Sequence, residues 1–351
     1  MTAQGEVTPV RETHRFNKEA LVEYLRPKLE GFHEDIKIHQ FTYGQSNPTF
    51  VIYGGKREYV LRKKPPGKLL PSAHAIDREY RILKALQNTD VPVPRMYLLC
   101  EDESVIGTAF YVMEKVKGRI FRDAIAENVS GPEERASIFD SMNETLAHIH
   151  EVDWKGLGLA DFGKTGNYMA RQVNRWARQY ETSRTDRIET MDNLIQWLTG
   201  NIPEDDITTI VHGDFRFDNL IFHPKEPRVV ATLDWELSTL GHPFADLAYS
   251  CMKYYFSFSL HSRGYRGLDL GALGIPTEKE YVETYCRRTG RDEIKDWKFF
   301  VAFGIFRLAA ICQGVYKRGL MGNASSENAR KYGAQVWSLS KIACEAISDS
   351  E

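Results

Sequence analysis

The chain has 351 residues and a formal net charge of −2 at pH 7. This length is enough for two lobes with substantial cores, and the near-neutral charge provides no overall field that would favour nucleic acid as a partner. The five cysteines are scattered and none belongs to a CxxC pair, which predicts free thiols, no zinc site and a cytoplasmic location.

A membrane partner is not expected either. The N-terminal sequence MTAQGEVTPVRETHRF has no apolar core of a secretory signal. By inspection, no apolar run approaches the length of a membrane span.

The N-terminal third is predicted to form an antiparallel sheet of five strands with helices. Asn17 can cap a helix over 18–29, and Ser72 can cap another over 73–86. Apolar alternation between turn residues predicts the strands, which cover 36–41, 49–53, 58–63, 97–100 and 108–116.

The loop 43–48 between the first two strands is a candidate phosphate-binding segment. Ser46 and Asn47 offer hydrogen-bond donors, and Gly44 permits close approach of the backbone. Because the loop matches neither the Walker A motif nor the GxGxxG of protein kinases, an ordinary hairpin loop is the alternative.

The third strand, YVLRK at 59–63, resembles the VAIK strand of kinases. Strand alternation puts Val60 and Arg62 on one face and Lys63 on the other. The motif places Arg62 where kinases have the cation that binds phosphate, with Lys63 as the rival. Glu79 in the next helix is the expected ion-pair partner of this cation, and a solvated charge cluster is the alternative.

The fifth strand leads into the sequence FYVMEKVKG at 110–118. We interpret 113–116 as a hinge between a first lobe (1–115) and a second lobe (116–351). In a hinge of this kind the backbone binds adenine and apolar side chains clamp the ring. Met113, Glu114 and Val116 are therefore candidate cofactor-binding residues, and a plain buried edge strand is the alternative.

The segment 210–235, IVHGDFRFDNLIFHPKEPRVVATLDW, is predicted to form a β-hairpin with strands at 220–222 and 229–233. Asp214 and Asn219 precede it at the Asp-to-Asn spacing of the kinase catalytic loop. Asp234 follows it, where the metal-binding Asp of a DFG-like segment would fall. Phosphoryl transfer needs a carboxylate near the attacking hydroxyl and hard oxygen ligands for Mg²⁺. A surface loop rich in Asp and Asn is the alternative.

Helices are predicted for most of the chain after residue 121. Two histidines, His148 and His150, are two residues apart and cannot share a helix face, so they are interpreted as structural or surface residues. Asp246 is expected to cap its helix or to support the loop around Asp214. The predicted helices cover 132–150, 167–180, 188–198, 241–255, 277–288, 297–317 and 328–347.

Together these segments resemble the aminoglycoside phosphotransferase and choline kinase-like family, whose members are small-molecule kinases with a protein-kinase-like bilobal fold. The most specific matches are HGDFRFDN at 212–219 and LDWE at 233–236, supported by YVLRK, REY at 78–80, the hinge and GHPFADLA at 241–248. Within the family, the segments YVLRKKPPG, DNLIF and LDWELSTLGHPFADL most resemble those of kinase-like domains fused to, or encoded near, acyl-CoA dehydrogenases. The resemblance implies an α+β fold with a sheet-containing first lobe and a mainly helical second lobe that carries the catalytic hairpin.

The resemblance also implies a role for each motif residue. Asp214 would be the catalytic base, Asn219 and Asp234 would hold Mg²⁺, and Arg62 with Glu79 would bind the phosphates of ATP. His212 would brace the catalytic loop. A functional link to an acyl-CoA dehydrogenase is expected from the same relatives.

Charge is the only property of the sequence that indicates the class of phosphoryl acceptor. From residue 250 to the end the chain carries 15 Lys/Arg and 11 Asp/Glu, a balance of +4, whereas a pocket for a cationic aminoglycoside should be acidic. A neutral or anionic hydroxyl compound such as a hydroxyacyl-CoA is favoured, with choline, sugar or aminoglycoside as alternative acceptors. An inactive nucleotide- or CoA-binding module is the alternative function, because the strand lysine is replaced by arginine. Candidates to meet the phosphates of a CoA ester are Arg263, Arg266, Arg287, Arg288, Arg307, Lys317 and Arg318.

Overall fold

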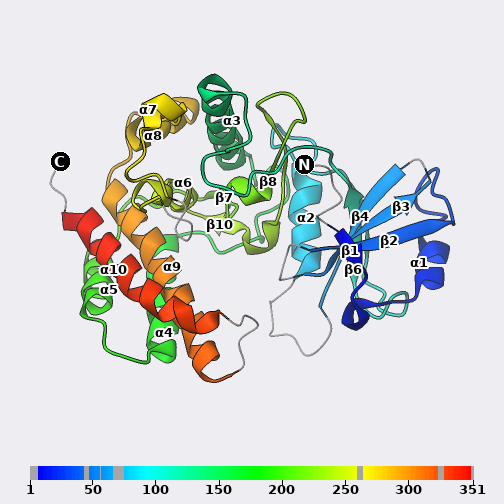
Figure 1. Cartoon of the computed structure of the whole chain (residues 1–351), viewed down its shortest axis with the longest axis horizontal. Coiled ribbons are helices and arrows are strands. Elements are labelled where there is room, and N and C mark those ends of the chain that lie inside the picture. The colour runs from blue at the N-terminus through cyan, green and yellow to red at the C-terminus, as the bar shows by residue number, and fades with distance from the viewer. Residues whose placement is uncertain are drawn as a thin grey trace. The chain divides into compact units, whose positions relative to one another are not determined.

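A computed structural model describes residues 7–42, 47–55, 57–65, 75–258, 264–322 and 328–348. The chain divides into two compact units, and each is described by itself. Unit 1 contains residues 1–119, 157–159 and 219–238, and unit 2 contains the rest. Unit 1 holds an antiparallel sheet with helices and unit 2 is mainly helical (Figure 1), which confirms the predicted α+β class.

The sheet of unit 1 has six antiparallel strands within the described residues, in the order β1-β2-β3-β4-β6-β5. The prediction of five strands was wrong because it missed β1, a three-residue edge strand that pairs with β2. Pro9 at the end of β1 is tolerated because an edge strand needs fewer ladder donors. The strands are β1 (Val7–Pro9), β2 (Ile36–Phe41), β3 (Thr49–Gly54), β4 (Arg57–Lys63), β5 (Met96–Cys100) and β6 (Phe110–Glu114).

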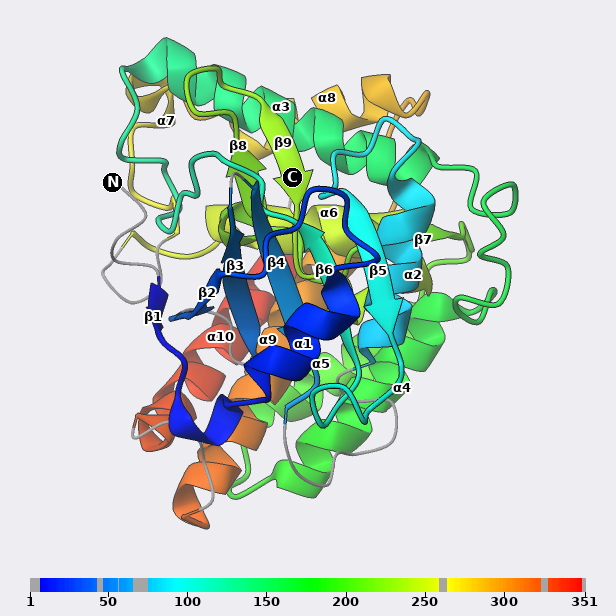
Figure 2. The same ribbon diagram turned by 90° about the vertical axis from the view of Figure 1, so that its right-hand side faces the viewer.

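Two helices pack on this sheet (Figure 2). Helix α1 (Lys18–Leu25) places Leu21 and Leu25 in a core with side chains from β2, β3, β4 and β6. Its predicted cap is confirmed, since Asn17 Oδ1 accepts from Ala20 N at 3.0 Å. The helix ends earlier than predicted because Pro27 cannot donate a helical hydrogen bond.

Helix α2 (Ile76–Leu86) contacts β5 and β6 and buries Ile82, Leu83 and Leu86. Its predicted cap, Ser72, and the predicted start at residue 73 lie outside the described residues. This helix places Glu79 beside the sheet, where that carboxylate is 1% exposed.

The predicted hairpin is present as β8 (Leu220–Phe222) and β9 (Val229–Thr232), with a register shift near Phe222. It packs with unit 1, because Phe222 exchanges two 2.8 Å backbone hydrogen bonds with Arg119 and Thr232 N donates to Pro92 O at 2.8 Å. We had assigned the hairpin to a second lobe. The lobe boundary between 115 and 116 remains a prediction.

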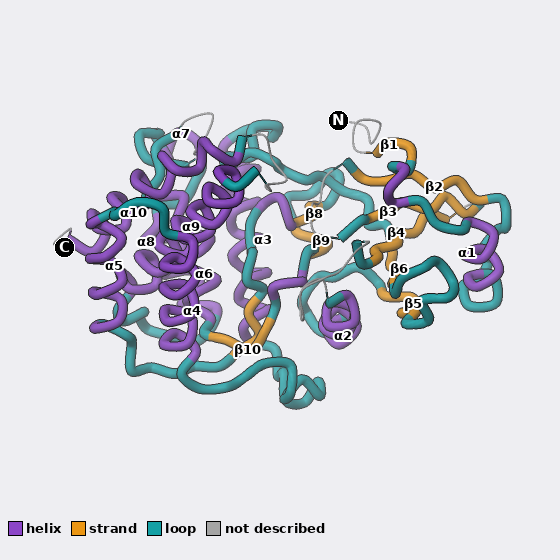
Figure 3. The backbone as a smooth tube through the Cα atoms, turned by 90° about the horizontal axis from the view of Figure 1, so that it is seen from below, coloured by secondary structure: helices purple, strands orange, loops and turns teal. Residues whose placement is uncertain are grey.

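Unit 2 contains the helices predicted after residue 121 with shifted ends, and a short helix, α7, that was not predicted. It also contains a short pair of strands, β7 (Thr209–Val211) and β10 (Thr239–Gly241). Helices α9 and α10 run side by side (Figures 1 and 3). All five cysteines are free, as predicted. The helices are α3 (Pro132–Glu151), α4 (Tyr168–Ser183), α5 (Glu189–Gly200), α6 (Pro243–Cys251), α7 (Leu270–Leu273), α8 (Glu278–Arg288), α9 (Trp297–Leu320) and α10 (Tyr332–Ser348).

Helix α9 corrects one expectation. It is the one helix in the described part of the chain that is long and apolar enough, by length and composition, to cross a membrane. We had expected no run of that kind. However, 67% of its apolar stretch is buried inside the structure, as expected of the core helix around which α4, α5, α6 and α10 pack.

Candidate functional site

The first polar cluster lies in unit 1 and is centred on Arg62 of β4. Arg62 Nε lies 3.1 Å from Glu79 Oε2, which is the expected ion pair. Arg62 Nη2 lies 2.7 Å from Asp234 Oδ1 and 3.2 Å from Glu236 Oε2. One guanidinium is therefore shared by three carboxylates from α2 and the segment after β9.

The electrostatics of this cluster follow from its burial. Burial raises the pKa of Glu79 to about 7, although Arg62 opposes the shift. Burial also works against the charge of Arg62, but Glu79 and its neighbours hold the pKa of the guanidinium above its ordinary value. Since three carboxylates share one arginine, the cluster has a local excess of negative charge that favours an additional cation.

Asp234 and Asn219 supply oxygen atoms suited to such a cation. Leu233 N donates to Asn219 O at 2.8 Å, which ties the two ends of the hairpin together next to Asp234. Asp234 adopts a left-handed conformation (φ 65°, ψ 57°) at the start of a 3-10 turn, Trp235–Leu237, a backbone state that Asp tolerates better than most residues. Carboxylate and amide oxygens are the ligands that Mg²⁺ prefers, so this pair fits the metal that the sequence implied.

Lys63, the rival cation, lies on the opposite face of β4. Its ammonium is 5.4 Å from the ring of Phe16 and 5.9 Å from that of Phe50, and burial lowers its pKa. Val60 is buried on the Arg62 side and pairs with Met113 across β4 and β6. The geometry thus joins Arg62, and not Lys63, to the predicted acidic partner.

The two remaining predicted segments of the nucleotide site are partly described. Asn47 donates to Glu236 Oε2 at 3.3 Å, which links the end of the 43–48 loop to the Arg62 cluster. Ser46 and Gly44 lie outside the described residues. In the predicted hinge, the Glu114 N–H donates to Arg95 O at 2.8 Å, so that N–H is already used, and Val116 follows the end of β6.

The second polar cluster lies in unit 2 and is centred on Asp214. Tyr249 of α6 donates its hydroxyl to Asp214 Oδ1 at 2.6 Å, and Arg216 Nε donates to Asp214 Oδ2 at 3.2 Å. Burial, together with the Asp214 carboxylate, raises the pKa of Tyr249, which keeps this phenol a proton donor. The carboxylate therefore accepts a hydrogen bond on each of its oxygens, one from α6 and one from its own loop.

Buried side chains hold the backbone of the loop that carries Asp214 through hydrogen bonds. The Asp246 carboxylate accepts hydrogen bonds from the backbone N–H groups of His212 and, at 2.9 Å, Gly213. His212 Nδ1 accepts from Asp214 N at 3.2 Å. His150 Nε2 lies 3.6 Å from Asp246, and burial lowers the pKa of this histidine. The supporting roles expected for Asp246 and His212 are present, and His150 is structural.

Three contributors were not predicted. Tyr249 follows Asp246 by three residues on the same helix and so shares its face, which is a signal the sequence contained. Glu236 and Arg216 lie within the two most specific motifs, but neither was assigned a role from the sequence. Arg307, predicted as a candidate for phosphate contact, instead donates to Gly213 O at 3.0 Å.

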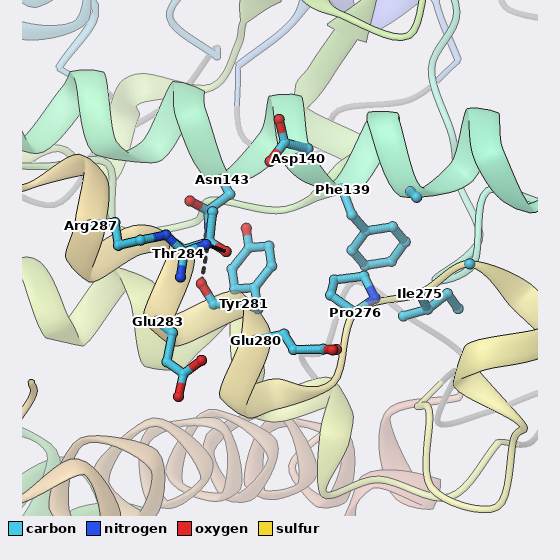
Figure 4. Close-up of a pocket in the computed structure, with 12 residues that line it drawn as sticks. Phe139, Asp140, Asn143, Ile275, Pro276, Glu280, Tyr281, Glu283, Thr284 and Arg287 are labelled. Carbon is cyan, nitrogen blue, oxygen red and sulfur yellow. Dashed lines mark hydrogen bonds between the residues drawn. The ribbon is translucent and has the colours of Figure 1, made fainter.

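A cavity of about 420 Å³ lies between α3 and α8 of unit 2 (Figure 4). Phe139, Ile275 and Pro276 lie together at its apolar end. Two of the polar lining residues join the two helices: Asp140 pairs with Arg288, and Asn143 Nδ2 donates to Tyr281 O at 2.8 Å. Arg287, a predicted phosphate contact, is the one candidate among the residues that line this cavity, whereas Arg288 is paired with Asp140. Among the other predicted phosphate contacts, Arg263 lies outside the described residues.

The fold is that of the kinase-like phosphotransferases. The chain belongs to the phosphotransferase enzyme family, whose model matches residues 37–293. This confirms the resemblance seen in the motifs.

Three relatives illustrate the family. The crystal structure of a Ralstonia eutropha protein assigned to the aminoglycoside phosphotransferases is 48% identical, with a TM-score of 0.87 over 95% of this chain and 98% of that one. Choline kinase of Cryptosporidium parvum is 13% identical, with a TM-score of 0.65 over 94% of this chain and 97% of that one, and shows the fold alone.

The third relative, acyl-CoA dehydrogenase family member 10 of Mus musculus, is 50% identical over 338 residues. These residues make up 95% of this chain and 31% of the relative. The chain spans 31–45% of the length of the curated relatives that it matches.

Proposed function

We propose that the protein is an ATP- and Mg²⁺-dependent kinase that transfers the γ-phosphate to the hydroxyl of a small molecule. The observation that carries this proposal is the Arg62–Glu79 ion pair joined to Asp234, because a cation fixed by a buried acid beside a metal-binding carboxylate is what phosphate binding requires. Asp214, oriented by Tyr249 and braced by Asp246, supports the role of general base.

Each of the candidate site residues has a separate role in the proposed reaction. Arg62 binds phosphate oxygens with a permanent positive charge, and Asn219 and Asp234 hold Mg²⁺, which neutralises phosphate charge when bound. Asp214 orients the acceptor hydroxyl and takes its proton. A cytoplasmic location and a functional link to an acyl-CoA dehydrogenase are part of the proposal, the latter supported by the names of the relatives.

The test is turnover by the Asp214→Ala variant. We expect it to lose transfer of phosphate from ATP and to keep ATP binding, measured by calorimetry. Asp140→Ala is the matched control, because it removes a carboxylate that is 59% exposed and is paired with Arg288, and it should keep both. Substantial turnover by Asp214→Ala would contradict the assignment of the base. ATP binding without turnover by the unaltered protein would identify an inactive nucleotide-binding module.

A further inference from the structure

Both oxygens of the Asp214 carboxylate already accept hydrogen bonds. Oδ1 accepts from the Tyr249 hydroxyl at 2.6 Å, and Oδ2 accepts from Arg216 Nε at 3.2 Å. A general base must direct a lone pair at the proton that it removes. Each oxygen keeps a second lone pair, but a carboxylate that is stabilised by two donors is a poorer proton acceptor. Withdrawal of one donor would therefore make Asp214 a more effective base toward an acceptor hydroxyl.

Tyr249 is the fixed donor. It comes from a separate element, α6, and the guanidinium of Arg307 lies over its ring at 5.6 Å. The same guanidinium donates to Gly213 O at 3.0 Å. Displacing Tyr249 would therefore disturb contacts with α9 and with the loop that carries Asp214.

Arg216 is the movable donor. Its side chain is 48% exposed, and its two ion-pair partners are Asp214 and, at 3.1 Å, Asp218. Both partners lie two residues away on the same loop. An ion pair with a half-exposed partner gains less than a buried one, and the guanidinium is well suited to bind a carboxylate or phosphate in place of these two carboxylates.

We propose that Arg216 recognises an anionic group of the phosphoryl acceptor and, in moving to it, frees Asp214 Oδ2 to act as the base. This inference rests on the proposed kinase function and restricts its acceptor to hydroxyl compounds that carry a carboxylate or phosphate. The acceptor oxygen forms a bond to the γ-phosphorus, the bond from that phosphorus to ADP breaks, and the hydroxyl proton passes to Oδ2. Tyr249 stays on Oδ1, and an uncharged alcohol leaves Arg216 in place.

The experiment uses ATP hydrolysis, with water as the acceptor, in the full chain. Two probes without an acceptor hydroxyl on their acyl chain supply the anion: butyrate for a carboxylate and butyryl-CoA for phosphates. We expect one of them to stimulate hydrolysis by the unaltered protein. Arg216→Ala should hydrolyse ATP at least about tenfold faster without a probe, because a released general base contributes 10²- to 10⁴-fold, and the probe should then have no effect.

The control variant is Arg187→Ala, which removes an 81% exposed arginine paired with Asp192 and should behave like the unaltered protein. Thermal unfolding checks that each variant is folded. Failure of both probes to stimulate the unaltered protein, or hydrolysis by Arg216→Ala no faster than normal, would overturn the inference. If Asp214→Ala hydrolyses ATP as fast as the unaltered protein, the proposed function itself fails.

Discussion

Replacing Arg62 by methionine should strongly destabilise unit 1. The substitution preserves much of the side-chain length but leaves Glu79, which is 1% exposed, without the cation 3.1 Å from it. Removing one partner of a buried ion pair costs about 3–5 kcal/mol, because an uncompensated charge stays buried. Asp234 and Glu236 lose the same partner, so relaxation cannot easily recover the loss.

The measurement is native-state hydrogen exchange of the β4 amides, which reports opening of the sheet itself. A loss of about 3–5 kcal/mol corresponds to exchange roughly 10²- to 10⁴-fold faster. The double variant Arg62→Met with Glu79→Gln should recover part of the loss, because the buried charge is removed. Burial raises the pKa of Glu79 to about 7 even though Arg62 lowers it. Loss of Arg62 therefore favours the protonated carboxyl further, and the single variant should be less impaired at pH 5 than at pH 8.

Arg26→Met is the matched control in the same unit. Arg26 pairs with Glu34 at 2.8 Å, but the two side chains are 58% and 62% exposed. An exposed pair is worth about 0–1 kcal/mol, so this variant should exchange almost normally. Equal acceleration in Arg26→Met and Arg62→Met would refute the reasoning from burial.

Three further outcomes are expected. Asp246→Ala should lower the free energy of unfolding of unit 2 by about 2–5 kcal/mol in urea titrations, because it leaves two buried backbone N–H groups without their charged acceptor. Burial lowers the pKa of His242 to about 4, so the neutral ring is favoured in the folded state and up to about 3 kcal/mol of stability is lost as the pH falls from 6.5 towards 4. Protonation of His242 Nδ1 also removes the acceptor of the Phe244 N–H, and His242→Asn should flatten this acid dependence. Asn17→Ala should destabilise α1 by about 1 kcal/mol through loss of its cap, as seen in thermal unfolding.

Local patterns in the sequence were sufficient for part of the site. The alternation of side chains along a strand assigned Arg62 and Lys63 to opposite faces, and the spacing within one short segment placed Asn219 and Asp234 at the two ends of a hairpin. Helix capping likewise predicted Asn17 correctly. In each case the determining signal lies within about 25 residues, where backbone geometry limits the alternatives.

The contacts that the sequence did not predict join residues far apart in the chain. Arg62 donates to Glu236, which is 174 residues away in the sequence, and Tyr249 donates to Asp214, which is 35 residues away. Nothing local distinguishes Glu236 from a solvated acid or Tyr249 from a core aromatic, because their roles depend on which elements pack together. The edge strand β1 was missed for the same reason. Its three residues form a strand because they pair with β2, about 30 residues later in the chain, and nothing within the three residues indicates that pairing.

The identity of residue 62 has a consequence for chemical labelling. An analogue of ATP that carries an amine-reactive acyl group depends on a lysine beside the phosphates, since an amine can be acylated whereas a guanidinium remains protonated. In this protein the proposed phosphate contact is an arginine, and the adjacent Lys63 is buried on the other face of its strand. A labelling survey with such a reagent would not modify this protein at residue 62, and the Arg62→Lys variant would introduce a reactive amine there.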